Sequence, residues 1–223
     1  MLPRGPGAYF ELYVKVFRRH VYNQQMDHPL QCTCGSLKGI VSHPERVNRV
    51  VCYCRDCQAF AHFLGRAGEI LDAKGGTDVI QTIPANVTFT QGQEALACMR
   101  LTDKGLMRWY ARCCNTPIGN TLADFRISFI GLVHTCLEDP NRSLDDSFGP
   151  VRMWSFTKGA KVSVESRPLA MIAGILRFIP MLTGARISGD YKRTPLFSAD
   201  TGSPVVAPKV LSPSERDAVY AAV

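Results

Sequence analysis

The sequence lacks several features that would place it in a broad class of proteins. It has no run of about 18 uncharged apolar residues, so we expect no transmembrane helix. Its N-terminus, MLPRGPGAYFELYVKVFRRH, lacks the uninterrupted apolar core of a signal peptide. We therefore expect a cytoplasmic protein, in a compartment where thiols stay reduced.

The sequence also lacks a dense block of lysine and arginine, although its net charge is +7. Residues 1–25 hold four basic residues and one acidic residue, and residues 151–223 hold ten and five. A basic tail can contact nucleic acid or an anionic membrane. The sequence favours a solvated basic surface and leaves nucleic acid open as a partner.

Composition divides the 223 residues into three predicted parts. Residues 1–25 are an N-terminal extension, with Met26 as a candidate natural start. Residues 26–140 form a zinc-binding β domain, and residues 141–223 form a C-terminal extension packed on it. Short runs rich in β-branched and aromatic residues predict strands. They are LQCTCGSLKGIV, RVVCYC, DVIQTI, NVTFTQG, LMRWYARCC and RISFIGLVHT.

Helices are expected at one place in the middle of the chain and at two near its end. RDCQAFAHFLGRAG predicts a short helix that ends at Gly65 or Gly68. SPSERDAVYAAV predicts a terminal helix with Ser212 as N-cap, Pro213 at its first position and Glu215 as capping-box partner. NRSLDDSFGP is expected to be a loop.

The third predicted helix lies in the apolar stretch SRPLAMIAGILRFIPMLTGARISG. It should start near Pro168 and break at Pro180. Arg177 and Arg186 interrupt the stretch, which argues against a membrane span. Packing on the domain or on the partner subunit of a homodimer is favoured, and docking on a membrane surface is the alternative.

Cysteine is the residue with the strongest pattern. Seven of the nine cysteines form three groups, and Cys98 and Cys136 stand alone as expected inert buried thiols. The groups are Cys32 and Cys34; Cys52, Cys54 and Cys57; and Cys113 and Cys114. Clustered thiols in a reducing compartment indicate metal, because zinc prefers short-spaced thiolates.

The grouping predicts two zinc sites. Cys32 and Cys34 with Cys113 and Cys114 would close a structural site. Cys52, Cys54 and Cys57 supply only three ligands, and an open fourth position is typical of a catalytic zinc. The alternative is a structural site completed by Cys98, His62 or Asp56.

The order C-x-C-G, C-x-C-x-x-C, a late cysteine pair and GLVHT resembles the glutathione-dependent formaldehyde-activating enzyme family, whose domain centromere protein V shares. The matching residues are Cys32, Cys34 and Gly35; Cys52, Cys54, Cys57 and Gln58; Cys114 with Thr116 and Pro117; and Gly131 to Thr135. The resemblance covers roughly residues 28–140. It implies a mainly β fold, a β-tent of small antiparallel sheets around zinc, here followed by C-terminal helices.

The resemblance also implies a structural zinc, a second and more labile zinc, and a carbon–sulfur lyase reaction between formaldehyde and glutathione. Two departures are visible. Ala111 stands where the family has the first late cysteine, and Tyr53 stands where relatives commonly have histidine. Because adjacent cysteines on a strand point to opposite faces, Cys113 and Cys114 can share one metal only if the backbone bends there.

Several other side chains are candidates for the site. His62 follows Cys57 and could shuttle protons, which makes it a predicted catalytic residue beside the three cysteines. His134 could line the pocket, although a buried histidine bonded to a backbone carbonyl is as good an interpretation. Arginines near the cysteines could bind a substrate carboxylate; they are Arg55, Arg66 and Arg112.

Three functions remain after these observations. The first is a zinc-dependent carbon–sulfur lyase acting on a small thiol such as glutathione. The second is a non-catalytic zinc-stabilised binding module that uses its basic C-terminal region. The third is a thiol redox protein using C-x-x-C, which stoichiometric zinc would argue against because metallated thiolates are not free to cycle.

Overall fold

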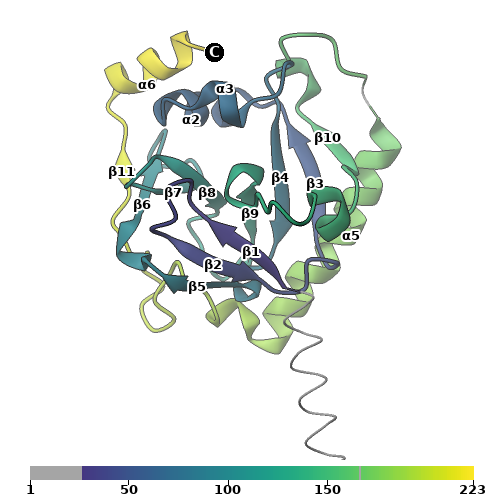
Figure 1. Cartoon of the computed structure of the whole chain (residues 1–223), viewed down its shortest axis with the longest axis vertical. Helices are drawn as coiled ribbons and strands as arrows, with labels where there is room; N and C mark the ends of the chain where they lie inside the picture. Colours follow the sequence, from purple (N-terminus) through teal and green to yellow (C-terminus); the bar gives the residue numbers. More distant parts are fainter. Residues whose placement is uncertain (1–26, 166) are drawn as a thin grey trace, which may run out of the picture.

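The computed structural model describes residues 27–165 and 167–223 and contains two β-sheets flanked by helices (Figure 1). The smaller sheet is antiparallel, in the order β1-β2-β5. Its strands are β1 (His28–Gln31), β2 (Lys38–Val41) and β5 (Val87–Gln91). The predicted N-terminal extension and the start at Met26 lie outside the described residues.

The larger sheet has eight strands in the order β10-β3-β4-β9-β8-β7-β6-β11. They are β3 (Asn48–Cys52), β4 (Thr77–Thr82), β6 (Leu96–Arg100), β7 (Met107–Ala111), β8 (Thr116–Thr121), β9 (Ile130–Val133), β10 (Met153–Ser155) and β11 (Lys209–Val210). The expected richness in strands is confirmed, and the smaller sheet is antiparallel as expected, but the larger sheet differs from the expectation of small antiparallel sheets. This sheet is large and mixed, because β10 pairs with β3 and β11 with β6 in parallel.

Residues after 140 supply both parallel strands, one at each edge of the larger sheet. The division at residue 140 therefore stays a prediction. The sequence did not reveal β10 and β11, since strands of three and two residues are too short to show alternation. It also missed β6 (LACMR), which has no β-branched residue, and β8 (TPIGNT), in which proline and glycine signal a turn.

The main core lies between the two sheets, and strand alternation decides which side chains enter it. In β7, Met107 and Trp109 point into this core, and Trp109 Nε1 donates to Thr121 Oγ1 of β8 at 2.9 Å. Because successive side chains of a strand point to opposite faces, Arg108 lies on the other face of the sheet. That face carries the candidate site.

The described helices are α2 (Arg55–Phe63), α3 (Ala67–Ile70), α4 (Leu144–Phe148), α5 (Pro168–Ser188) and α6 (Pro213–Ala221). Two predicted ends are confirmed. α2 is followed by Gly65 with φ +69°, a conformation that glycine adopts without strain. α6 begins with the expected capping box, in which Ser212 N donates to Glu215 Oε2 at 2.9 Å and Glu215 N to Ser212 Oγ at 3.3 Å.

Two local predictions were wrong. The expected loop NRSLDDSFGP contains α4, because Ser143 and Asp146 form a capping box that starts a helix there. Pro180 does not break α5, which continues to Ser188. Proline removes one backbone donor, and the carbonyl that loses it belongs to Leu176, an exposed residue whose backbone water can reach.

By length and composition alone, α5 is long and apolar enough to cross a membrane, with a mean hydropathy of 1.5 and 11% of its window buried. The expected absence of a membrane span therefore stays a prediction. Figure 1 shows α5 running along the outside of the larger sheet, beside β3 and β10.

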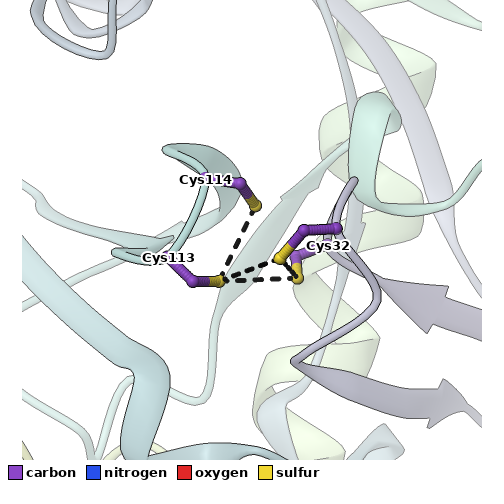
Figure 2. Close-up of side chains that lie close together, drawn as sticks. Cys32, Cys113 and Cys114 are labelled. Atoms are coloured by element: carbon purple, nitrogen blue, oxygen red, sulfur yellow. Dashed lines mark hydrogen bonds between the residues drawn. The ribbon is translucent and has the colours of Figure 1, made fainter.

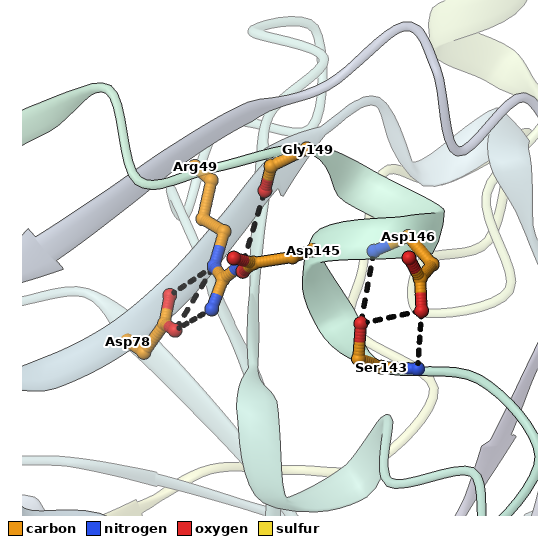
Figure 3. Close-up of polar contacts among 6 residues, drawn as sticks. All are labelled: Arg49, Asp78, Ser143, Asp145, Asp146 and Gly149. Atoms are coloured by element: carbon orange, nitrogen blue, oxygen red, sulfur yellow. Dashed lines mark hydrogen bonds and ion pairs between the residues drawn. The ribbon is translucent and has the colours of Figure 1, made fainter.

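An arginine fastens the edge of the larger sheet to α4 (Figure 3). Arg49 of β3 is buried, and its Nη2 donates to Asp78 Oδ2 of β4 at 2.7 Å. Its Nη1 donates to the Gly149 carbonyl at 3.0 Å and pairs with Asp145 of α4. These contacts hold the chain on its way into β10, which forms part of the cavity wall described below.

Candidate metal centres and the adjoining cavity

The first cysteine group joins two turns that are far apart in the sequence. Cys32 and Cys34 lie in the turn between β1 and β2, and Cys113 and Cys114 lie in the turn between β7 and β8. Asn115 adopts φ +54°, so the backbone bends after the adjacent pair. Because the chain turns here, the side chains of Cys113 and Cys114 need not point to opposite faces as they would on a straight strand. All four sulfur atoms lie within 4.8 Å of one another.

The sulfur spacing of this four-cysteine cluster fits a tetrahedral ion. Zinc–sulfur bonds of about 2.3 Å in a tetrahedron place neighbouring sulfur atoms ~3.8 Å apart. Cys32 Sγ lies 3.5 Å from Cys34 Sγ and 3.8 Å from Cys113 Sγ. Cys113 Sγ lies 3.3 Å from Cys34 Sγ and 3.7 Å from Cys114 Sγ. Figure 2 shows the sulfur atoms of Cys32, Cys113 and Cys114 turned toward one another.

Neighbouring groups hold this cluster and stabilise thiolates in it. Leu37 N lies 3.3 Å from Cys32 Sγ and donates to it. Burial raises the pKa of Cys114, but hydrogen bonds from Thr116 and from backbone N–H groups outweigh burial and lower this pKa to about 6. The Ser36 hydroxyl and backbone lower the pKa of Cys34. Burial raises the pKa of Cys113 to about 12 and also raises that of Cys32. The cluster therefore favours a thiolate at Cys114 and needs a cation to hold all four sulfur atoms as thiolates, a role suited to zinc.

Two arginines predicted to bind substrate have structural partners here. Arg66 Nη1 donates to the Cys114 carbonyl at 2.9 Å and to Thr33 Oγ1 at 2.6 Å. Arg112 Nη2 donates to the Glu94 carbonyl at 2.5 Å. Arg66 thus links the two turns of the four-cysteine cluster, and neither arginine lines the cavity described below.

The second group, the three-cysteine cluster, forms where β3 passes into α2. Cys52 ends β3, Cys54 is the N-cap of α2, and Cys57 lies in its first turn. The Cys57 backbone N–H donates to Cys54 Sγ at 3.3 Å, and the sulfur atoms of Cys52 and Cys57 lie 3.8 Å apart. The positive end of a helix favours negative sulfur at this position.

The thiols of this cluster share their protons unequally. Hydrogen bonds from Cys54 and Cys57 lower the pKa of Cys52 to about 3. The same contacts raise the pKa of Cys54, and the contact with Cys52 raises the pKa of Cys57. One thiolate is therefore favoured without a metal, and a cation is needed to hold three. The three sulfur atoms also lie within 4.8 Å of one another, so this donor set fits zinc as well.

Three residues, Cys98, His62 and Asp56, are candidates for a fourth metal ligand at this cluster, and they lie in different places relative to it. Cys98 lies in the core between the sheets, where burial raises its pKa to about 12. His62 is five residues beyond Cys57 on α2, which turns it about 140° away from that cysteine. Asp56 is the member of the three that lines the cavity beside the cluster.

A cavity of about 540 Å³ adjoins the three-cysteine cluster, and all three cysteines line it. Its walls are mostly apolar side chains from β3, β4, β10 and the loops beside them. These are Val50, Val79, Leu106, Phe129, Met153 and Phe156. Asn120, Gln81, Arg55 and Arg108 contribute polar groups. The cavity therefore offers an apolar chamber with cysteine sulfur in its wall.

Arg108 is the functional candidate that the sequence did not reveal. Its side chain is 1% exposed, and Nη1 lies 3.2 Å from Asn120 Oδ1 and 4.0 Å from Cys57 Sγ. Nη2 pairs with Asp56 Oδ2 at 3.8 Å, and Nε has no partner among the described residues. A buried guanidinium with so few close partners supplies positive charge beside the thiols.

The remaining candidates lie around the cavity or away from it. Arg55 lines the cavity, but its Nη2 also donates to the Tyr220 carbonyl of α6 at 3.2 Å. His134 lines a separate cavity of about 330 Å³ with Asp72 and Asp78. The structure brings neither His134 nor His62 to the cavity beside the cysteines. Cys136 is buried, and burial raises its pKa, as expected for an inert thiol.

Comparison with known proteins adds one clear assignment. A family model described as "Family of unknown function (DUF6151)" matches residues 25–207. A crystal structure of a Rhodobacter sphaeroides protein is similar, with a TM-score of 0.35 and 17% sequence identity over 57% of this chain and 99% of that chain. Among curated proteins, none matches this chain significantly. The family match covers most of the chain, whereas the structural similarity is too low to carry an argument.

Proposed function

Because the chain belongs to DUF6151, a family of unknown function, we propose a function from the site itself: zinc-dependent carbon–sulfur lyase chemistry on an adduct of a thiol and an aldehyde. One observation carries this proposal. Three cysteines form a cluster with no fourth cysteine or histidine beside them in the described part of the chain, and they line a cavity of about 540 Å³. Such an arrangement leaves a coordination position for substrate.

The cysteine pattern gives the proposal its chemical direction. The spacing C-x-C-G, C-x-C-x-x-C and a late cysteine pair resembles glutathione-dependent formaldehyde-activating enzymes, which carry a β-tent fold. Formaldehyde and a small thiol such as glutathione are therefore the first substrates to test. The four-cysteine cluster would hold a structural zinc, and the three-cysteine cluster a more labile one.

The residues of the chain have separable roles in this chemistry. Cys52, Cys54 and Cys57 would hold the ion, which when bound supplies a Lewis acid and keeps a substrate thiol deprotonated. Arg108 balances negative sulfur, since Zn²⁺ with three thiolates has a net charge of −1. The apolar walls exclude water, which strengthens the attraction between Arg108 and the thiolates.

The reaction itself conserves all atoms. In the forward direction the sulfur of the thiol attacks the carbonyl carbon of formaldehyde, so that a C–S bond forms and the C–O π bond breaks. The proton of the thiol ends on the oxygen, and the product is the S-hydroxymethyl thiol. The reverse reaction breaks the C–S bond, and neither direction needs an oxidant or a reductant.

The test is a rate measurement with zinc-loaded protein. Glutathione and formaldehyde are mixed with the full chain, and adduct formation is compared with the spontaneous reaction. We expect a zinc-dependent rate that Cys54→Ser abolishes. Cys98→Ser, which removes a buried cysteine outside both clusters, should keep the rate. His62→Gln should also keep it, because the structure turns His62 away from Cys57.

A loaded protein with no rate above the spontaneous reaction, for glutathione and for smaller thiols, would remove the lyase proposal. The second candidate, a zinc-stabilised binding module, would then be preferred. The four-cysteine cluster supports that candidate, because a complete set of four thiolates is typical of structural zinc.

A further inference from the structure

Helix α5 is attached to the molecule by a narrow strip of its surface. Within the helix only Gly174 and Ala185 are buried. A Cβ at Gly174 would lie 2.9 Å from Met153 Sδ, so the helix backbone approaches β10 closely at that point. Phe178 meets Phe129 edge-to-face, with ring centroids 5.4 Å apart. Ala170, Phe178, Met181 and Leu182 are half-buried, and the remaining residues of this 21-residue helix are exposed.

The outward side of α5 carries an apolar stripe that runs along the whole helix. The stripe consists of Leu169, Ile172, Leu176, Ile179 and Ile187, which are between 48% and 87% exposed. At about 100° per residue these positions fall within a sector of roughly 80°. The row is continuous from Leu169 to Ile179, and Thr183 separates it from Ile187. Exposed leucine and isoleucine in such a row indicate a binding surface for an apolar partner.

The charges beside the stripe are of one sign. The helix contains no acidic residue, and its two arginines, Arg177 and Arg186, lie on opposite flanks of the stripe. Arg177 forms no ion pair with any described residue. Arg186 stacks over the Tyr191 ring at 4.5 Å and shares a small cavity with Asp124, which already pairs with Arg126. An anionic partner would complement both flanks.

One flank also opens into a basic cavity of about 470 Å³. Arg46, Arg177 and Arg193 line it together with His43. Asp190 in its wall pairs with Arg193 at 2.6 Å, and Arg46 pairs with Glu45 at 3.4 Å, so Arg177 is the lining arginine without an ion-pair partner among the described residues. Helices that lie on a membrane surface combine an apolar stripe with positive charge beside it. Their apolar side chains enter the acyl-chain region, and their arginines contact anionic lipid headgroups.

A second copy of the chain fits this surface less well. A twofold contact through the stripe would bring Arg177 and Arg186 close to arginines of the other copy with no acidic residue of α5 between them. A membrane-spanning arrangement is also disfavoured, because it would strip Gly174 and Phe178 from β10 and Phe129. We propose that α5 lies flat on an anionic membrane surface and docks the protein there through the stripe.

Vesicle binding by the full chain tests this docking. Zinc-loaded protein is sedimented with vesicles of phosphatidylcholine and with vesicles of equal parts phosphatidylcholine and phosphatidylserine. We expect binding to the mixed vesicles that Leu176→Glu weakens at least about tenfold. Val210→Glu is the matched control, because Val210 is a 46% exposed apolar residue on β11, at the opposite edge of the larger sheet.

Arg177→Gln combined with Arg186→Gln should reduce the preference for the anionic vesicles and its dependence on salt. Zinc content and melting temperature should not change in Leu176→Glu. Several results would overturn docking. The first is that the full chain does not bind the mixed vesicles, and the second is that Leu176→Glu binds them as well as the wild type. The third is a dimer that Leu176→Glu dissociates while neither protein binds vesicles. The fourth is a clear loss of thermal stability in Leu176→Glu. The last result would mean that another part of the chain covers the stripe.

Discussion

A single buried charge, Arg108, distinguishes the two cysteine clusters. The four-cysteine cluster has hydroxyl and backbone donors around it, whereas the three-cysteine cluster has a guanidinium at 4.0 Å from Cys57 Sγ. That guanidinium makes one short hydrogen bond, to Asn120 Oδ1 at 3.2 Å. Removing the charge should therefore affect one site and leave the other intact.

Arg108→Met tests the role of this charge. We expect zinc at the three-cysteine cluster to bind about 10- to 100-fold more weakly, because a group that supports metal ligands typically contributes that much. Zinc at the four-cysteine cluster should be unaffected. Competition with a chelator, followed as two separate transitions, measures both. Arg126→Met is the control, since Arg126 is exposed and pairs with Asp124. If Arg108→Met left zinc release from the three-cysteine cluster unchanged, Arg108 would have no role in holding that zinc.

His28 should make the stability of the fold depend on pH. It is fully buried, with Nε2 at 2.7 Å from the Leu137 carbonyl and Nδ1 at 2.9 Å from Ser147 Oγ. Burial lowers its pKa below 6.5. The unfolded chain then binds the proton more readily, so the contribution of His28 to stability is present above pH 6.5 and is lost as the pH falls below it.

Denaturant titrations at pH 7.5 and 5.5 check this expectation, with zinc content measured at each pH. Wild-type protein should lose about 1 kcal/mol more between the two values than His28→Gln. His43→Gln, at an exposed histidine, should lose as much as the wild type. Equal losses in wild type and His28→Gln would show that other groups set the dependence.

At the scale of elements, close backbone packing between turns positions the first cluster. Gly92 directly follows β5 with φ +72°, and a Cβ there would lie 2.0 Å from the Ser36 carbonyl oxygen. Ser36 follows Cys34 by two residues in the turn between β1 and β2. The turn that holds half of the four-cysteine cluster thus rests directly on the backbone at Gly92.

Gly92→Ala should disturb this contact in two measurable ways. We expect a loss of about 1–3 kcal/mol in the free energy of unfolding, from the clash and from alanine at positive φ. Zinc at the four-cysteine cluster should bind more weakly, while the three-cysteine cluster keeps its affinity. Gly184→Ala is the control, because a Cβ there meets nothing within 4 Å and alanine favours a helix. Normal zinc binding by the four-cysteine cluster in Gly92→Ala would be the contrary result.

At the scale of the whole molecule, the two clusters occupy different structural positions. The four-cysteine cluster joins the turn of the smaller sheet to a hairpin of the larger one, so its metal would close the two sheets on their common core. The three-cysteine cluster joins neighbouring segments, β3 and α2, at the wall of a cavity. Loss of metal should therefore have unequal consequences.

Cys32→Ser should lower the melting temperature by about 10 °C or more, because structural zinc contributes directly to folding. Cys54→Ser should lose the zinc of the three-cysteine cluster and keep that of the four-cysteine cluster. Its melting temperature should stay within a few degrees of the wild type. Thermal unfolding and elemental analysis of both variants measure this. Equal destabilisation by both would mean that the three-cysteine cluster is also structural.

Local signals in the sequence determined much of this arrangement. Cys52, Cys54 and Cys57 could be grouped because six residues of chain keep them together in any conformation. Ser212, Pro213 and Glu215 predicted the start of α6, since capping contacts join residues three apart. The short spacing of Cys32 and Cys34 predicted half of the first cluster for the same reason.

Only the tertiary structure decided what depends on distant parts of the chain. Arg108 looks like an ordinary outward residue of LMRWYA, and it becomes a site residue because α2 packs on that face of the sheet, with Phe60 under the guanidinium. The parallel edges β10 and β11 pair with strands about 100 residues earlier, which no local pattern encodes. The apolar residues of α5 predicted a helix, but whether they face the core or the outside depends on the shape of the edge on which the helix packs.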